Sequence, residues 1–313
     1  MRILVIGANG FMGIHILSAI RAGLGDAEVL ATSRGPVPDP GFMPLDLSDE
    51  AATCAALADF RPSHVINLAG IAAPALSSRD PDTAWQVHLH AVRKLGEAML
   101  DIVPDAQLIN TGTGLVYGTS FRSGQPLDED ALPRPLDDYA ASKAAGDLAL
   151  AVLAGRGLRC LLMRPFNQAG AGQSEDFVIP AFAAQVARIE AGEAEPVIAV
   201  GNLEAERDFL DVRDVAGAYV SAIARGAAIA PGTILNLASG TPRRIGDVLA
   251  ALLALSPVAI SVAQDPARLR ASDIPRAVGD AGRAKALLGW SAAIPLVDTL
   301  QWVLDDQRRR RRV

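Results

Sequence analysis

Tyr139 and Lys143 stand four residues apart in a stretch, 137–155, that has the pattern of an amphipathic helix. On a helix this spacing puts both side chains on one face. A free tyrosine has a pKa of about 10 and exchanges protons poorly at neutral pH, but a neighbouring ammonium favours its ionised form. The pair is therefore a candidate proton-transfer site. Taken alone, the spacing indicates no more than two exposed residues on the same face of a helix.

Thr113 supplies a third group. It lies in the segment 111–118, Thr-Gly-Thr-Gly-Leu-Val-Tyr-Gly, directly after an apolar stretch that we expect to form a strand. Open α/β sheets bind their ligands at the carboxyl ends of their strands. A hydroxyl at that edge can hydrogen-bond a substrate oxygen that gains or loses charge. We predict that the catalytic residues are Thr113, Tyr139 and Lys143.

The elements that position these groups follow from the alternation of apolar and amphipathic stretches between residue 2 and about residue 164. This alternation is typical of a parallel sheet with helices on both faces. The predicted strands are 2–6, 29–33, 43–45, 64–68, 106–111 and 159–164, and the predicted helices are 11–22, 49–60, 81–101, 137–155 and 175–192. Beyond residue 195, apolar pieces at 196–200, 233–237 and 258–262 mix with helices near 213–225, 244–254, 281–288 and 296–307.

A glycine-rich turn, Gly-Ala-Asn-Gly-Phe-Met-Gly at 7–13, follows the first predicted strand. Glycines allow a tight strand-to-helix turn and close approach of the backbone, so a pyrophosphate can bind the free N–H groups of the helix N-terminus. The pattern is GxxGxxG, not the usual GxGxxG, but the physical requirement is the same. A turn required only for packing is the alternative. Its position directly after the first strand favours a dinucleotide.

The second predicted strand indicates which dinucleotide. NAD enzymes place Asp or Glu near the end of this strand, whereas this chain has Thr32, Ser33 and Arg34. A hydroxyl and a guanidinium suit a 2′-phosphate, so we expect NADP(H); the alternative is that Arg34 is a solvated loop residue. Asp46 and Leu47 could border the adenine. The predicted cofactor-binding residues are Gly7, Asn9, Gly10, Phe11, Met12, Gly13, Ser33, Arg34, Asp46, Leu47, Leu68, Ala69, Gly70, Thr111, Tyr139, Lys143 and Pro165.

These patterns predict an α/β fold, a Rossmann doubly wound parallel sheet with a smaller C-terminal mixed α/β substrate lobe. We expect an NADP-binding Rossmann domain over 1–165, to which later segments at about 205–240 return, and a lobe over 166–313 that mainly binds substrate.

Composition excludes several classes of protein. The chain has 313 residues, of which 50% are hydrophobic and 20% are charged, and its net charge is −6. That charge argues against nucleic-acid binding, which needs a positive surface. No apolar run approaches the length of a membrane span, and the chain begins directly with a predicted strand, so we expect a cytoplasmic protein without a membrane contact.

No metal site is expected. Cys54 and Cys160 are too far apart to form a metal-ligand motif, and we expect both to be buried reduced thiols. His15, His64 and His90 show no ligand spacing. The arginines at 308–312 are expected to form a frayed, solvated helix end.

With these motifs in order, the chain resembles the extended short-chain dehydrogenase/reductases over essentially its whole length. The glycine turn, Thr113, the Tyr-x-x-x-Lys pair and Arg-Pro-Phe-Asn at 164–167 follow in sequence. The segments 164–173, 177–180, 200–203 and 207–215 resemble the branch of GDP-mannose 4,6-dehydratase and GDP-4-dehydro-6-deoxy-D-mannose reductase, and 264–270 resembles the reductase in particular.

This resemblance implies a nucleotide-sugar site, with Arg207 and Arg268 on the phosphates. A diphosphate needs local arginines in a chain with net charge −6, although each arginine alone could form a surface salt bridge instead. The implied substrate-binding residues are Asn167, Val178, Arg188, Asn202, Arg207, Arg268 and Asp273.

The chain departs from the branch at three positions. Leu115 stands where an acidic residue is usual; a dehydratase needs that carboxylate to eliminate water, and leucine cannot move protons, so dehydration is not expected. His88 replaces a usual Asn and Gly112 a usual Ser. Neither change is expected to decide the chemistry.

The resemblance implies NADPH-dependent reduction of the C4 ketone of a GDP-4-keto-6-deoxyhexose to a GDP-6-deoxyhexose such as GDP-rhamnose. Two alternatives remain open. One is a nucleotide-sugar C4 epimerase, which keeps its cofactor; the other is a dinucleotide-binding regulator without turnover. The helices at 81–101 and 137–155 form a dimer interface in many relatives, which implies a homodimer.

Overall fold

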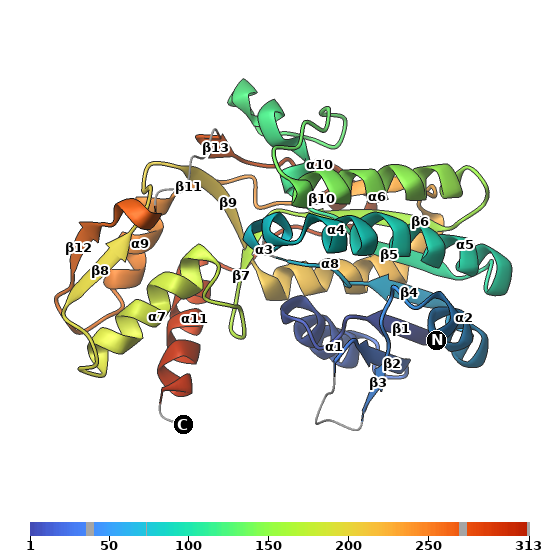
Figure 1. The fold of residues 1–313 in the computed structure, drawn as a ribbon, viewed down its shortest axis with the longest axis horizontal. Coiled ribbons are helices and arrows are strands. Elements are labelled where there is room, and N and C mark those ends of the chain that lie inside the picture. Colours follow the sequence, from blue (N-terminus) through green and yellow to red (C-terminus); the bar gives the residue numbers. More distant parts are fainter. Residues whose placement is uncertain (36–40, 73, 269–273, 312–313) are drawn as a thin grey trace.

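The computed structural model describes residues 1–35, 41–72, 74–268 and 274–311. A sheet of seven strands, each parallel to its neighbours, forms its centre (Figure 1). From one edge to the other the strands are β10 (Thr233–Leu237), β6 (Cys160–Pro165), β5 (Gln107–Thr111), β4 (His64–Asn67), β1 (Arg2–Ile6), β2 (Glu28–Ser33) and β3 (Phe42–Pro44).

The direction in which the chain adds strands reverses between β1 and β4. This is the strand order of the Rossmann doubly wound fold, extended by β10, which joins the edge late in the sequence. The fold class predicted from the sequence is therefore confirmed. Sheets of this kind leave a crevice beyond the carboxyl ends of the strands at the reversal.

Helices cover both faces of the sheet, as a parallel sheet requires because strands such as β5 and β6 are buried along their whole length. One hydrophobic core packs Leu57, Leu95 and Leu150 against the first face, and the other packs Ile16 and Tyr219 against the second. The helices of the first face are α2 (Glu50–Phe60), α5 (Val92–Ile102) and α6 (Asp138–Ala154); those of the second are α1 (Phe11–Gly23), α8 (Val212–Arg225) and α10 (Gly282–Leu288).

A smaller lobe with its own hydrophobic core lies beside the sheet (Figure 1). Strand β9 (Glu206–Asp211) pairs antiparallel with β11 (Pro242–Arg244) and parallel with β13 (Arg276–Ala277) and β7 (Asn167–Ala169). Strands β8 (Val197–Val200) and β12 (Ser261–Gln264) form a separate parallel pair. The helices of the lobe are α7 (Val178–Glu190), α9 (Ile245–Leu253) and α11 (Leu296–Arg310). The predicted mixed lobe is thus confirmed, while the domain boundaries at 1–165 and 166–313 stay a proposal.

The remaining elements are short helical segments. The helix predicted over 81–101 is interrupted, because α4 (Pro81–Trp85) leads into a π-helix, η1 (Gln86–Ala91), before α5 begins. The segment after β5, η2 (Gly114–Ser123), consists of two 3-10 helical stretches joined by a kink at Gly118, where φ is +45°. The others are α3 (Pro74–Arg79), η3 (Gly226–Ala228) and η4 (Pro266–Arg268).

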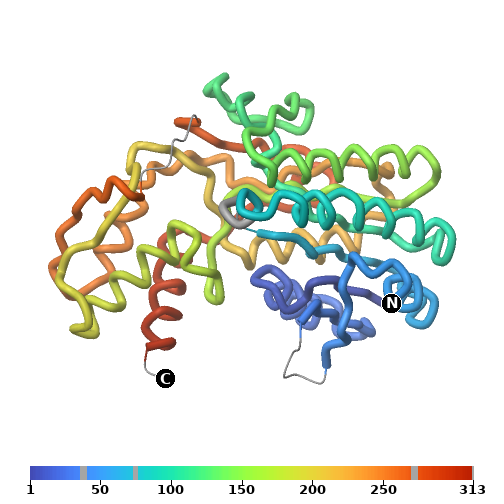
Figure 2. The backbone as a smooth tube through the Cα atoms, viewed as in Figure 1, coloured from blue at the N-terminus to red at the C-terminus, as the bar shows by residue number. Residues whose placement is uncertain are grey.

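The expected frayed arginine end is wrong for most of the segment. Helix α11 continues to Arg310 on the lobe, near the chain end drawn in Figure 2. Arg308 binds both carboxylate oxygens of Glu190, at 2.7 and 2.8 Å, and its guanidinium also reaches the Leu255 carbonyl at 3.2 Å. Arg311 pairs with Glu193. Acidic partners at the end of α7 therefore fix this helix end, which the sequence pattern of the tail alone did not reveal.

The prediction that both cysteines are buried can also be compared with the structure. Cys160 is buried as expected, but Cys54 is only partly buried. Within the described residues, no group of three or more His, Cys, Asp or Glu is arranged to hold a metal ion. None of the described helices is long and apolar enough to cross a membrane.

Candidate active site

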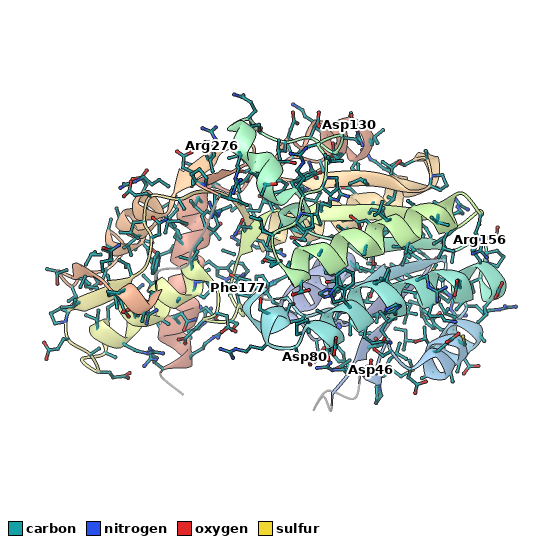
Figure 3. The ribbon with its side chains drawn as sticks, turned by 45° about the horizontal axis from the view of Figure 1, so that its top comes forward. Asp46, Asp80, Asp130, Arg156, Phe177 and Arg276 are labelled. Carbon is teal, nitrogen blue, oxygen red and sulfur yellow. The ribbon has the colours of Figure 1, made fainter. Side chains whose placement is uncertain are left out.

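A cleft of about 390 Å³ lies at the carboxyl ends of β1, β4, β5 and β6. Its walls come from both parts of the molecule, because Gly7 and Thr111 belong to the sheet side while Asn167 and Val178 belong to β7 and α7. Phe177, which also lines the cleft, lies where the lobe meets the sheet (Figure 3). A cleft at this reversal of strand order is where doubly wound folds bind nucleotides.

The glycines of the turn bring no side chain into the cleft, although Phe11 and Met12 of the same turn line it. Gly7 has φ +76°, and a Cβ there would come within 3.0 Å of the Ala69 nitrogen. A Cβ on Gly13 would lie 2.3 Å from the Ala8 carbonyl oxygen. Gly10 begins α1 without any side-chain cap, so the first N–H groups of the helix are not covered by a capping side chain. The turn therefore fits the pyrophosphate of a dinucleotide.

The three predicted catalytic side chains line this one cleft. Tyr139 is 8% exposed, and its hydroxyl group hydrogen-bonds the side chain of Thr113. Lys143, one turn further along α6, directs Nζ to the Thr111 carbonyl oxygen at 2.8 Å. Thr113 in turn accepts the backbone N–H of Leu115 at 3.2 Å, which orients its hydroxyl. The turn after strand β5 and helix α6 thus present a hydroxyl, a phenol and an ammonium to the same space.

Burial sets the protonation of the pair. It raises the pKa of Tyr139 to about 12, and the hydrogen bond with Thr113 opposes this rise. Burial also lowers the pKa of Lys143 to about 8, against the effect of the carboxylate of Asp147. The expectation that the ammonium makes the phenol acidic is therefore wrong for the protein alone, because desolvation outweighs it. A phenol that stays protonated at neutral pH is suited to donate a proton.

The cleft contains most of the predicted cofactor residues from the ends of the strands. Those that line it are Gly7, Gly10, Phe11, Met12, Gly13, Leu68, Gly70, Thr111, Tyr139, Lys143 and Pro165. The remaining ones, Asn9, Ser33, Arg34, Asp46, Leu47 and Ala69, lie outside its lining.

Three of these outlying residues have clear local roles. Ser33 is fully buried and its Oγ donates to the Gly35 carbonyl at 3.1 Å. Leu47 belongs to the hydrophobic core on the α2 face. Asp46 accepts the N–H of Ser48 at 2.9 Å. Arg34 is exposed at the end of β2.

The predicted substrate residues separate into two groups. Asn167 and Val178 line the cleft, whereas the other described ones do not. Arg188 pairs with Glu175 at 2.9 Å, and Arg268 pairs with Asp265 at 3.3 Å. Asn202 accepts the N–H of Glu204 at 2.9 Å.

Two members of the predicted set need separate mention. Arg207 is half-buried on β9, beside Ala277 of β13, which does line the cleft. Asp273 lies outside the described residues.

Sequence reasoning missed several lining residues between the strands and the lobe. Leu115 was singled out only as a departure from a pattern, yet it lines the cleft beside Thr113. Phe166 stands within the Arg-Pro-Phe-Asn motif, which gave a signal for it. The other residues missed there are Ile71, Ala72, Gln168, Gln173, Asp176 and Phe177.

Known proteins resemble this arrangement over the whole chain. The model of the NAD dependent epimerase/dehydratase family matches residues 3–238. The GDP-6-deoxy-D-mannose reductase of Pseudomonas aeruginosa is 32% identical over 312 residues, which cover 99% of this chain and 98% of that protein. The structure of RMD from Pseudomonas aeruginosa complexed with NADPH has a TM-score of 0.86 at 29% identity and covers 99% of both chains. A UDP-glucose 4-epimerase of Mycolicibacterium smegmatis is 27% identical and covers 95% of this chain and 96% of its own length.

Proposed function

We propose that this chain, which belongs to the NAD dependent epimerase/dehydratase family, uses NADPH to reduce the C4 ketone of a GDP-4-keto-6-deoxyhexose. The product is a GDP-6-deoxyhexose of the GDP-rhamnose type. The observation that carries this proposal is the presence of Thr113, Tyr139 and Lys143 in one cleft of a chain similar along its whole length to a GDP-6-deoxy-D-mannose reductase.

The turn with Gly7, Gly10 and Gly13 would hold the pyrophosphate of NADPH, and Arg34 would meet its 2′-phosphate at the end of β2. The similarity to RMD complexed with NADPH supports this choice of dinucleotide. When bound, NADPH supplies the hydride. Lys143, held by the Thr111 carbonyl, would bind the cofactor's ribose hydroxyls.

The protein's own groups handle the proton. Tyr139 is protonated at neutral pH and donates its phenolic proton to the substrate oxygen, and Thr113 holds that oxygen by a hydrogen bond. The positive charge of Lys143, one helical turn away, favours the phenolate that this step leaves. Burial of Thr113 and Tyr139 keeps water from these two groups and strengthens these interactions.

Leu115 argues against dehydration of the sugar. It lines the cleft next to Thr113 but has no group that could take a proton from a carbon of the sugar or return one to a leaving hydroxyl. Elimination of water therefore has no acid or base at this position. An apolar side chain is instead compatible with a sugar that already carries a methyl group.

The sugar nucleotide would extend from the cleft along the lobe. Asn167 and Val178, which line the cleft, would contact it there. Arg207 pairs in register with Ala277, which lines the cleft, so it is suited to bind the diphosphate. Arg268 would reach it only by leaving Asp265, and Arg188 only by leaving Glu175.

A homodimer is the assembly that the exposed surface of α6 supports. Leu148 and Val152 are 69% and 66% exposed, and they stand one helical turn apart on α6. Helices α5 and α6 lie side by side on the same face of the sheet (Figure 1). A second copy of this face would bury both side chains.

The experiment that tests the reaction measures NADPH oxidation and sugar product together, with the 4-keto substrate and with GDP-mannose as the control that lacks the ketone. One NADPH consumed per sugar reduced supports the proposal. Interconversion of C4 epimers without net NADPH consumption would instead establish the epimerase, the reaction named for the Mycolicibacterium smegmatis relative.

A further inference from the structure

His88 lies buried between the wall of the cleft and the catalytic helix α6. Only 2% of its surface is exposed. It belongs to η1, the π-helix that separates α4 from α5. Such π segments within helices are rare and occur frequently at functional sites. The imidazole ring of His88 meets the ring of Tyr139 edge-on, with 5.6 Å between the two ring centroids.

Both ring nitrogens of His88 have a partner. Nε2 lies 3.0 Å from the backbone nitrogen of Ile71, which can only donate. Nε2 must therefore accept, and the proton of the neutral ring sits on Nδ1. Nδ1 lies 2.9 Å from Oγ of Ser142, and that hydroxyl donates to the Tyr139 carbonyl at 3.1 Å. One chain of hydrogen bonds thus joins the cleft wall at Ile71 to the backbone of the catalytic tyrosine.

Two glycines make room for this chain. A Cβ on Gly70 would lie 2.9 Å from Nε2 of His88 and 3.2 Å from Nζ of Lys143. A Cβ on Gly146 would lie 2.3 Å from the His88 carbonyl oxygen. The His88 ring, the Lys143 ammonium and the cleft wall can therefore come together because Gly70 and Gly146 carry no side chains. Ser142, fully buried, completes the contact on α6.

The ring stays neutral in this setting. Burial, with a further contribution from the charge of Lys143, lowers the pKa of His88 to about 2. The charged group that acts on it is Lys143 of α6. Asp147, one turn beyond Lys143, is paired with Arg164. A neutral ring with an occupied acceptor cannot take a proton from Lys143, so His88 does not relay protons.

We propose that His88, as the neutral Nδ1–H tautomer, is a positioning residue that fixes the Gly70–Ala72 wall of the cofactor cleft relative to Tyr139 and Lys143. The inference deepens the proposed function, on which it rests for the identity of the dinucleotide. The decisive contact is the one to Ile71, because Gly70, Ile71 and Ala72 line the cleft.

Two variants of His88 test the hydrogen bonds of its two ring nitrogens separately. In His88→Gln the longer amide carries an acceptor near the position of Nε2, so the Ile71 N–H keeps a partner. In His88→Asn the shorter amide reaches only toward Ser142, so the Ile71 N–H loses its partner. His90→Asn, at an exposed position of the same π-helix, is the matched control.

The measurement is the dissociation constant of NADPH, obtained by fluorescence titration without any sugar. We expect His88→Gln and His90→Asn to bind within about twofold of the unmodified chain, and His88→Asn to bind about tenfold more weakly, which corresponds to ~1.4 kcal/mol and to the loss of one buried hydrogen bond. Equal affinities for all four proteins, or equal losses in both His88 variants, would overturn the proposal.

A second readout does not depend on any ligand. The nitrogen-15 resonances of a histidine-labelled chain report which ring nitrogen is protonated. We expect His88 to show protonated Nδ1 with no titration across the neutral range, and a protonated Nε2 or a titrating ring would overturn the assignment. Because NADPH binding is measured without sugar, a chain that binds NADPH but reduces no 4-keto sugar would refute the proposed function and leave the role of His88 standing.

Discussion

Asp147 and Arg164 form an ion pair inside the protein, with 2.9 Å between Oδ2 and Nε and only 3% of either side chain exposed. The hydroxyl of Tyr117 accepts from the same guanidinium at 3.1 Å and donates to Asn236 at 2.8 Å. Oδ1 of Asp147 has no hydrogen-bond partner among the described residues. Asp147 lies one turn beyond Lys143 on α6. Its carboxylate charge acts on the Lys143 ammonium and opposes the lowering of the Lys143 pKa by burial.

This relationship predicts a pH dependence. Lys143 carries its charge below its pKa of about 8 and loses it above, so kcat should fall as pH rises through that value. Asp147→Asn removes a charge that raises this pKa, so the falling limb should move to lower pH. The check is the pH profile of kcat at saturating NADPH, with the exposed Asp105→Asn as the control. An unmoved limb in Asp147→Asn would show that the limb does not report Lys143.

Tyr139→Phe removes the phenolic proton while keeping the ring that packs against His88. We expect kcat to fall by about 10²–10⁴-fold, the usual contribution of a general acid, with NADPH affinity and melting temperature close to those of the unmodified chain. Single-turnover rates with the 4-keto sugar provide the measurement. Turnover that survives the substitution would mean that another group donates the proton.

Arg34→Ala tests the choice of dinucleotide. Arg34 is exposed at the end of β2, where a guanidinium can meet a 2′-phosphate that NADH lacks. We expect the dissociation constant of NADPH to rise at least about tenfold, the factor for a loss of ~1.4 kcal/mol, and that of NADH to change little. Equal losses for both dinucleotides would remove Arg34 from the site.

Leu148→Glu tests the dimer. A carboxylate on the exposed face of α6 would have to be buried without a partner in an interface, which is costly. We expect the variant to be a folded monomer by light scattering, while Leu132→Glu, at a 60% exposed position outside α6, keeps the dimeric mass. A dimeric Leu148→Glu would place the interface elsewhere, and a monomeric unmodified chain would refute the dimer itself.

The sheet and the three catalytic side chains were predictable because their signals are local. Strands such as β6 read as continuous apolar runs, and the Tyr-x-x-x-Lys spacing fixes a helical face without knowledge of the tertiary fold. Strand β9 was missed because its sequence, Glu-Arg-Asp-Phe-Leu-Asp, is largely charged and has no apolar run.

Other features depend on neighbours that are distant in sequence. Arg308 looked like part of a solvated tail, and only the fold brings Glu190 to it. Ser33 seemed available to a phosphate, but its hydroxyl turns to the Gly35 carbonyl. The pKa of Tyr139 was expected to be lowered by Lys143, and the depth of burial that raises it instead cannot be read from spacing. His88 gave no sign of its two hydrogen bonds, because Ile71 and Ser142 meet it only in the folded chain.

The most direct test of the account follows the hydride itself. NADPH carrying deuterium at the transferred position of its nicotinamide is incubated with the chain and a GDP-4-keto-6-deoxyhexose, and the sugar product is analysed by mass spectrometry and NMR. The account predicts one deuterium at C4 of each product molecule, and it predicts about 10²–10⁴-fold less labelled product from Tyr139→Phe on the same time scale. Product formed without deuterium at C4 would contradict it.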